Sequence, residues 1–177
     1  NVLYLGKSIR ALVRSELERQ LKALEKSLQK LEKTIAAVIA ANEEVQRKKA
    51  LAQTVTGIGP VLASELIAHT EGFTRFKNPR QLVCYVGCAP FERSSGSSVR
   101  GRTATSACAN KRLKSLLRLA SLAAARSPGD LRDYYLRKLE QGKRPIVALN
   151  NVAGKIIHHL WAVLASGNPY SRYLHMS

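Results

Sequence analysis

The segment from Ser8 to about Gln53 contains neither glycine nor proline. Such a run of helix-compatible residues predicts one continuous helix of roughly 70 Å at 1.5 Å per residue. Its apolar side chains recur at alternating steps of four and three: Leu17, Leu21, Leu24, Leu28, Leu31, Ile35 and Val38. This 3.5-residue repeat is typical of a coiled-coil seam.

Asn42 interrupts the seam before it resumes at Val45, and a polar residue there could set the register of pairing. The simpler alternative is a helix that lies on its own domain. Because the spacing is kept over three heptads, the coiled coil is favoured. We expect it to form a homo-oligomer, dimer or tetramer, or to pair with another helix of the complete protein.

The rest of the chain predicts a compact helical domain. Periodicity and capping signals indicate helices at 60–69, 81–86, 106–126, 130–141 and 145–166. The segment 90–105, rich in Ser, Gly and Arg, should be a loop, and no segment alternates convincingly as a strand. The predicted fold class is all-α, with a coiled-coil helix at 1–53 and a C-terminal domain at 54–177.

The charge predicts a polyanionic partner. The chain has 29 Lys and Arg against 12 Asp and Glu, a net charge of +17 and a pI near 10.3. Nucleic acid is the usual partner of such a surface, although ribosomal and membrane-surface proteins share it. No apolar run is long enough for a membrane span, and no signal peptide pattern occurs.

The charge is also unevenly placed. Between Gly72 and Gly129 the only acidic residue is Glu92. The same stretch holds eleven basic residues: Arg75, Lys77, Arg80, Arg93, Arg100, Arg102, Lys111, Arg112, Lys114, Arg118 and Arg126. Because solvated helix faces normally mix signs, we expect nucleic acid to contact this part of the chain.

Metal sites find little support in the sequence. Three cysteines, without zinc-type spacing, suit a reducing cytoplasm and are interpreted as packing residues: Cys84, Cys88 and Cys108. His158 and His159 are adjacent, so they point to different helix faces and should not share a metal. Tyr134 and Tyr135 lack the Arg and His residues of a tyrosine recombinase around them and are also interpreted as packing residues. No metal or cofactor is expected in this chain.

Gly57-Ile58-Gly59, with Ala63 four positions later, has the pattern of a helix-hairpin-helix. Glycine lets the backbone turn sharply and approach a phosphate, which backbone N–H groups and the next helix N-terminus can then hold. Such contacts reach the DNA backbone and read no sequence. The alternative is an ordinary turn between two helices.

The segment from Glu92 to Arg102 contains serines among arginines. In isolation it resembles a flexible linker. Alternatively, a serine hydroxyl could attack a phosphodiester, while Arg93, Arg100 and Arg102 stabilise the negative charge that develops on phosphate oxygens. Gly96 leaves room for the phosphate.

Asn110-Lys111-Arg112 opens a further basic stretch. Lys111, Lys114 and Arg118 stand three and four residues apart, on one helix face. This face is either solvated surface or a phosphate contact, and the absence of acidic residues on the helix favours the contact.

Several ordered blocks between about Thr54 and Leu164 resemble the C-terminal transposase domain of the insertion sequence 110 family, a group that includes Piv-type DNA invertases. The blocks are Gly57-Ile58-Gly59-Pro60, Phe73-Thr74-Arg75-Phe76-Lys77, Pro79-Arg80-Gln81-Leu82, Tyr85-Val86-Gly87, Ala89-Pro90, Ser94-Ser95-Gly96, Asn110-Lys111-Arg112-Leu113, Ser127-Pro128 through Gly142-Lys143, and Ala148 to Trp161.

The resemblance implies DNA strand exchange by a serine nucleophile. The family serine directly precedes a glycine, which implies Ser95, with Ser94 as the second candidate. It also implies an N-terminal RuvC-like domain that carries Mg²⁺, a coiled coil that supports oligomerisation, and an element-encoded bridge RNA as guide. The chain starts at Asn1 without methionine and lacks that acidic domain, so we expect it to be the C-terminal part of a longer protein.

The sequence departs from the family at Ala109, where glycine is common, so a turn there could become helix. The predicted function is that of a bacterial or archaeal cytoplasmic, nucleoid-associated recombinase that joins strands through a phosphoserine. The fragment alone should bind nucleic acid without cutting it. The alternative is a non-catalytic helix-hairpin-helix module for DNA binding and dimerisation.

Overall fold

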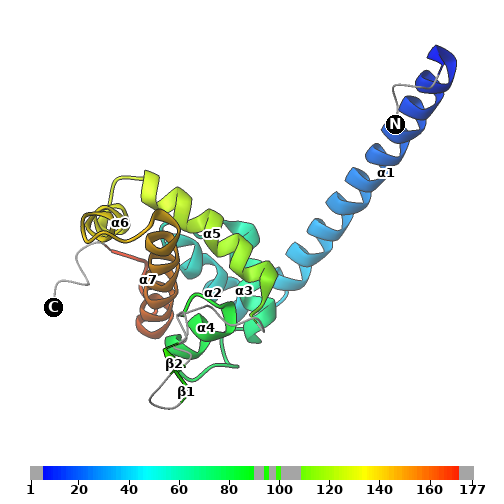
Figure 1. Ribbon diagram of the computed structural model, residues 1–177. Helices are drawn as coiled ribbons and strands as arrows, with labels where there is room; N and C mark the ends of the chain where they lie inside the picture. The colour runs from blue at the N-terminus through cyan, green and yellow to red at the C-terminus, as the bar shows by residue number, and fades with distance from the viewer. Residues whose placement is uncertain (1–5, 90–93, 96–98, 101–108, 172–177) are drawn as a thin grey trace. The chain divides into compact units, whose positions relative to one another are not determined.

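A computed structural model describes residues 6–89, 94–95, 99–100 and 109–171 (Figure 1). The chain divides into two compact units, residues 1–46 and 47–177. The described residues form seven helices and two short strands: α1 (Lys7–Ala40), α2 (Glu43–Thr54), α3 (Pro60–Thr70), α4 (Pro79–Val86), β1 (Ser94–Ser95), β2 (Val99–Arg100), α5 (Lys111–Arg126), α6 (Asp130–Glu140) and α7 (Pro145–Ser166). The predicted helical architecture is thus confirmed, with one small addition. None of the described helices is both long and apolar enough to cross a membrane.

The predicted uninterrupted helix from Ser8 to Gln53 is wrong at Ala41 and Asn42, where α1 ends and α2 begins. The Asn42 side-chain oxygen accepts a hydrogen bond from the Val45 backbone N–H at 3.1 Å. A short amide side chain competes in this way for backbone donors and favours a helix start over a helix interior. Asn42 therefore caps α2.

The apolar seam of α1 is exposed in the single chain. Its seven residues from Leu17 to Val38 leave between 51% and 69% of their surface open to solvent. A row of leucines exposed at this spacing is the surface that a coiled coil would cover. Pairing through it stays a prediction.

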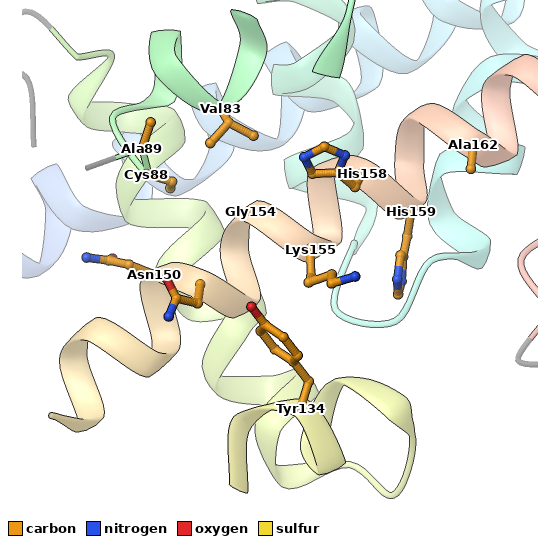
Figure 2. A pocket seen from close by; sticks show the side chains of 11 residues that line it. Val83, Cys88, Ala89, Tyr134, Asn150, Gly154, Lys155, His158, His159 and Ala162 are labelled. Atoms are coloured by element: carbon orange, nitrogen blue, oxygen red, sulfur yellow. The ribbon is translucent and has the colours of Figure 1, made fainter. Parts of the chain in front are cut away.

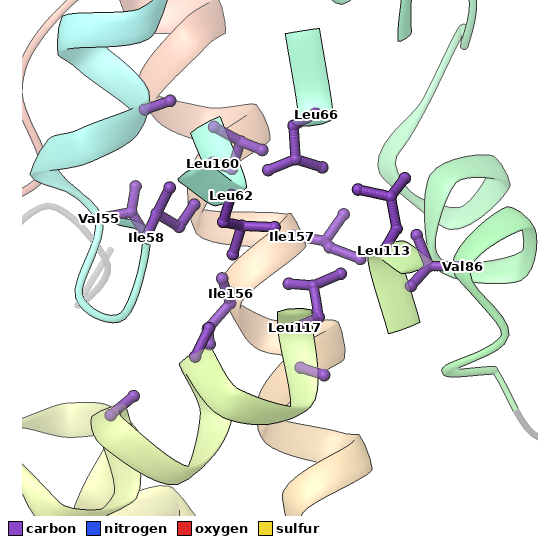
Figure 3. Packing of buried hydrophobic residues seen from close by; sticks show 14 of the residues in the cluster. Val55, Ile58, Leu62, Leu66, Val86, Leu113, Leu117, Ile156, Ile157 and Leu160 are labelled. Atoms are coloured by element: carbon purple, nitrogen blue, oxygen red, sulfur yellow. The ribbon is translucent and has the colours of Figure 1, made fainter. Parts of the chain in front are cut away.

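The core of the second unit lies between α3, α5 and α7 (Figure 3). Leu62 and Leu66 point inward from α3, while Leu113 and Leu117 do so from α5. Ile156, Ile157 and Leu160 of α7 complete the cluster and are fully buried. Burial of each such side chain contributes about 1.5–3 kcal/mol. The aliphatic core therefore fixes α5 against α7.

Local signals position the ends of α3, α6 and α7 close to the predicted bounds, whereas α4 begins at Pro79, two residues before the predicted start. Pro60, Pro79 and Pro145 begin three of these helices, where proline loses no hydrogen bond. The Asn78 side chain caps α4 by accepting from the Gln81 N–H at 3.0 Å. Gly87, with φ +74°, ends α4 in a left-handed conformation that favours glycine.

The predicted loop at 90–105 contains a minimal antiparallel ladder. Its register pairs Ser94 with Arg100 and Ser95 with Val99. Two residues per strand gave no detectable alternation in the sequence, so the ladder was not predicted.

Candidate nucleic-acid interface

The turn between α2 and α3 carries the two predicted phosphate-binding glycines, and they differ. Gly57 has φ +94°, and a Cβ built there would lie 2.6 Å from the carbonyl oxygen of Ala120 on α5. Glycine at position 57 is thus required by the fold, because the backbones of the turn and of α5 approach each other closely there. Gly59 is extended, its Cβ would meet open space, and it stands at the exposed N-terminus of α3. The positive end of the α3 dipole is therefore available to an anion at Gly59.

A polar cluster joins α3, α4 and the start of α5. The Asn110 amide nitrogen donates to the Tyr85 hydroxyl at 3.1 Å and lies 3.2 Å from His69 Nδ1. The Asn110 side-chain oxygen accepts from the Leu113 N–H at 3.0 Å, which caps α5. The Asn110 backbone N–H also donates to the Tyr85 carbonyl at 3.0 Å. One side chain thus starts α5 and fixes it to α4.

This cluster brings together the two ends of the serine-containing segment. A Cβ at Gly87 would overlap the side chain of Ala109, so residues 87 and 109 are in contact. The residues that flank the serine-containing segment therefore meet at one place, which we call the neck and define by Tyr85, Gly87, Ala109 and Asn110. The expectation that helix replaces a turn at Ala109 is wrong, and the helix predicted from Ser106 starts only at Lys111. Asn110 stops the helix there because its side chain acts as the N-cap.

Two predicted nucleic-acid-binding arginines are oriented by the protein beside the neck. The Arg75 guanidinium lies 5.1 Å from the Tyr85 ring centroid and donates to the His69 carbonyl at 3.3 Å. Arg112 donates to Glu65 at 3.1 Å. Both arginines stay exposed, so each can still face a phosphate.

The remaining predicted basic residues are placed around the same helices. Lys77, Arg80, Lys111 and Arg118 are exposed on α4, α5 and the turn before α4. Lys114 is half-buried, with its ammonium 3.7 Å from a Cβ built at Gly87. The structure therefore brings Lys114 to the neck.

Lys114 also lies close enough to Cys88 to influence its thiol. Burial raises the pKa of Cys88 to about 11, although Lys114 opposes part of this rise. The buried Cys88 is thus a packing residue, as predicted. Cys84 is half-buried and free, and Cys108 lies outside the described residues.

The predicted serine site is described only in its backbone. Ser94, Ser95 and Arg100 belong to the β1–β2 ladder, whereas Arg93 and Arg102 lie outside the described residues. The ladder sets Arg100 opposite Ser94, the second candidate, and Val99 opposite Ser95.

A cavity of about 550 Å³ between α4, α6 and α7 was not predicted from the sequence (Figure 2). Tyr134 lines it from α6, and Asn150, Asn151, Lys155 and His158 line it from α7. On α7 these residues are mixed with core positions, so periodicity gave no sign that they face a common space.

The two adjacent histidines differ in burial, although both line the cavity. His159 is buried, stacks on Tyr170 at a centroid distance of 5.0 Å and lies 3.7 Å from the Asp130 carboxylate, whereas His158 is exposed. Within the described ranges, no three His, Cys, Asp or Glu residues gather into a group that could hold a metal ion.

The region that contains the neck and the exposed cations of α4 and α5 is similar to a known family of proteins. Residues 49–136 match the model of the family described as Transposase IS116/IS110/IS902. The chain belongs to this transposase family.

Individual relatives agree with this assignment. The chain is 29% identical over 84% of its length to the 44.8 kDa protein of insertion element IS116 from Streptomyces clavuligerus. It is 30% identical over 88% of its length to a probable family 20 transposase of Pseudomonas aeruginosa. It is 21% identical over 92% of its length to the pilin gene-inverting protein of Moraxella bovis. The chain spans 36%, 45% and 51% of these three relatives, respectively.

Proposed function

We propose that this chain is the serine-bearing part of a recombinase that cuts and rejoins DNA through a phosphoserine at Ser95. The observation that carries the proposal is its similarity both to transposases and to a protein named as a gene inverter. Transposition and inversion have in common that DNA strands are broken and joined to new partners. The similarity covers the neck and the segment that it holds.

The chemistry needs a serine, cationic groups and room for a phosphate. The serine oxygen forms a bond to phosphorus while its proton passes to a general base. The bond from phosphorus to one sugar oxygen breaks, and that oxygen takes a proton from a general acid and leaves as a hydroxyl. Arg93, Arg100 and Arg102 would stabilise the charge on the non-bridging oxygens. Reversal of the same step joins a new strand without ATP, because the phosphoserine keeps the energy of the broken bond.

The partners of the complete protein follow from the same proposal. DNA contacts Gly59 and the exposed cations of α4 and α5, and an element-encoded bridge RNA guides the choice of sites. Copies assemble through the seam of α1. Magnesium would be held by a separate N-terminal domain, as the resemblance to the family implies.

The test compares Ser95→Ala and Ser94→Ala in the full-length protein. Ser95→Ala should abolish recombination and the covalent protein–DNA product while DNA binding stays unchanged. Ser94→Ala should retain activity, and loss of activity only in this variant would move the nucleophile to Ser94. Unchanged recombination in both variants would contradict the serine mechanism.

The second candidate function is a non-catalytic module that binds DNA through the α2–α3 turn and dimerises through α1. The exposed N-terminus of α3 at Gly59 favours it. Under this function, neither Ser95→Ala nor Ser94→Ala would change recombination by the full-length protein. Gly59→Asp, which puts an acidic group at the phosphate position, would weaken DNA binding.

A further inference from the structure

The cavity between α4, α6 and α7 adjoins the serine segment. Cys88 and Ala89, the last two residues before the undescribed part of that segment, form part of its wall. Its volume of about 550 Å³ lies within the range of small-ligand sites, about 300–1,000 Å³. A single nucleotide would fit this space.

The lining has the chemistry of a nucleotide site. Lys155 and His158 offer cationic or donor groups on one side, and Asn150 and Asn151 offer amides that can both donate and accept. The Tyr134 ring adds an aromatic surface, with the Lys155 ammonium 5.6 Å from its centroid. Among the described residues that line the cavity, none is acidic, and Asp130 lies behind it against His159.

His158, on the cavity wall, lies close enough to two cations to feel their charge. Burial lowers the pKa of His158, and the charges of Lys155 and Arg80 lower it further. The neutral form of His158 is therefore favoured, and an entering phosphate would favour the protonated form instead, because it places a negative charge beside the ring and the Lys155 ammonium.

Gly154 gives an independent sign that the space is kept open. It lies inside α7, where glycine destabilises a helix by about 1 kcal/mol relative to alanine. Neither its φ nor its packing requires glycine, since a Cβ built there meets nothing within 4 Å. Because Gly154 lines the cavity, the missing side chain enlarges it. The fold itself gives no reason for this glycine, whereas a ligand in the cavity does.

We propose that this cavity binds one nucleotide of the nucleic-acid strand that passes the serine segment. Its phosphate lies at Lys155 and His158, and its base lies against Asn150, Asn151 and Tyr134. The inference rests on the proposed function for the nature of the ligand, but not on the identity of the nucleophile. A base held outside the stack beside the reacting strand would fix the register of that strand.

The test measures binding of the 177-residue chain to fluorescein-labelled single-stranded DNA and to RNA of the same sequence by fluorescence anisotropy. Gly154→Leu fills the cavity, and Lys155→Gln removes its central charge. Lys143→Gln removes an equal charge from an exposed position outside the cavity and is the matched control. Gly154→Ala should raise the melting temperature, which shows that position 154 accepts a side chain without loss of fold.

Gly154→Leu and Lys155→Gln should each weaken binding about tenfold, as expected for loss of a charge-assisted phosphate contact or of the space for it. Lys143→Gln should weaken binding less than about threefold because its charge is exposed and screened. Comparison of the DNA and RNA probes identifies which strand supplies the nucleotide. Equal affinities of the two cavity variants and Lys143→Gln would overturn the inference and leave the proposed function intact. Absence of binding by the unaltered chain would overturn both.

Discussion

Replacement of Asn110 by alanine tests whether the neck is held by its polar cluster. The change removes two interactions of one side chain: the cap on the Leu113 N–H at 3.0 Å and the donation to the Tyr85 hydroxyl at 3.1 Å. Loss of an N-cap costs about 1 kcal/mol, and loss of a half-buried side-chain hydrogen bond costs about 1 kcal/mol more. We therefore expect the free energy of unfolding to fall by about 2 kcal/mol. In a chain of this size, that lowers the melting temperature by roughly 4–8 °C.

Urea denaturation, monitored by circular dichroism, measures this fall in the free energy of unfolding, provided that the m-value stays constant. Two variants separate the contributions. Asn78→Ala removes a cap alone, at 3.0 Å on Gln81, and should cost about 1 kcal/mol. Asn110→Asp keeps a capping oxygen but loses the amide donor, so it should also cost about 1 kcal/mol. If Asn110→Ala costs no more than Asn78→Ala, the cluster at the neck contributes nothing and the reasoning is refuted.

Three further predictions concern other parts of the chain. Gly57→Ala should destabilise by about 2 kcal/mol or more, because it combines a positive φ with overlap on the Ala120 carbonyl, whereas Gly59→Ala should cost under about 1 kcal/mol in the same urea titration. Cys88 should resist iodoacetamide at neutral pH in the folded chain and react in urea, as read by mass spectrometry. Equal labelling in the folded chain and in urea would contradict the burial of Cys88. Its raised pKa also makes a contribution to the free energy of unfolding that is present below pH 9.0 and is lost as the pH rises toward about 11. Leu24→Glu on the α1 seam should reduce the mass seen by sedimentation to that of one chain, and an unchanged mass would exclude this seam as the interface.

Much of the secondary structure could be predicted because its signals are local. Pro145 and Gly167 flank α7, and the predicted bounds of that helix agree with the structure. The break at Asn42 shows the limit of this approach. The heptad pattern continues on both sides of Asn42 and predicted an unbroken helix, whereas the asparagine side chain caps α2. The start of α5 was missed for the same reason, since Asn110 as N-cap excludes the residues before it.

The residues of the candidate site could be predicted from the sequence, but the contacts that orient their side chains could not. The sequence indicated Arg75 and Arg112 as phosphate-binding residues, and only the structure shows that Tyr85 and Glu65 orient them. Gly57 was interpreted as a phosphate contact, although its closest neighbour is the backbone of α5. A glycine pattern is the same for both roles, because either one requires only that the backbone be approached closely.

The helical class, the positions of most helix ends and the excess of cations between Gly72 and Gly129 follow from the amino-acid sequence alone. These properties depend on spacing, capping and composition, which act between near neighbours in the chain. The contact between residues 87 and 109 at the neck depends on how the helices pack. So does the cavity that Gly154 and Lys155 of α7 line together with Tyr134 of α6. Such juxtapositions arise from the packing of Leu117, Ile156 and the rest of the aliphatic core, where contacts join residues far apart in sequence and leave no periodic trace at the positions they bring together.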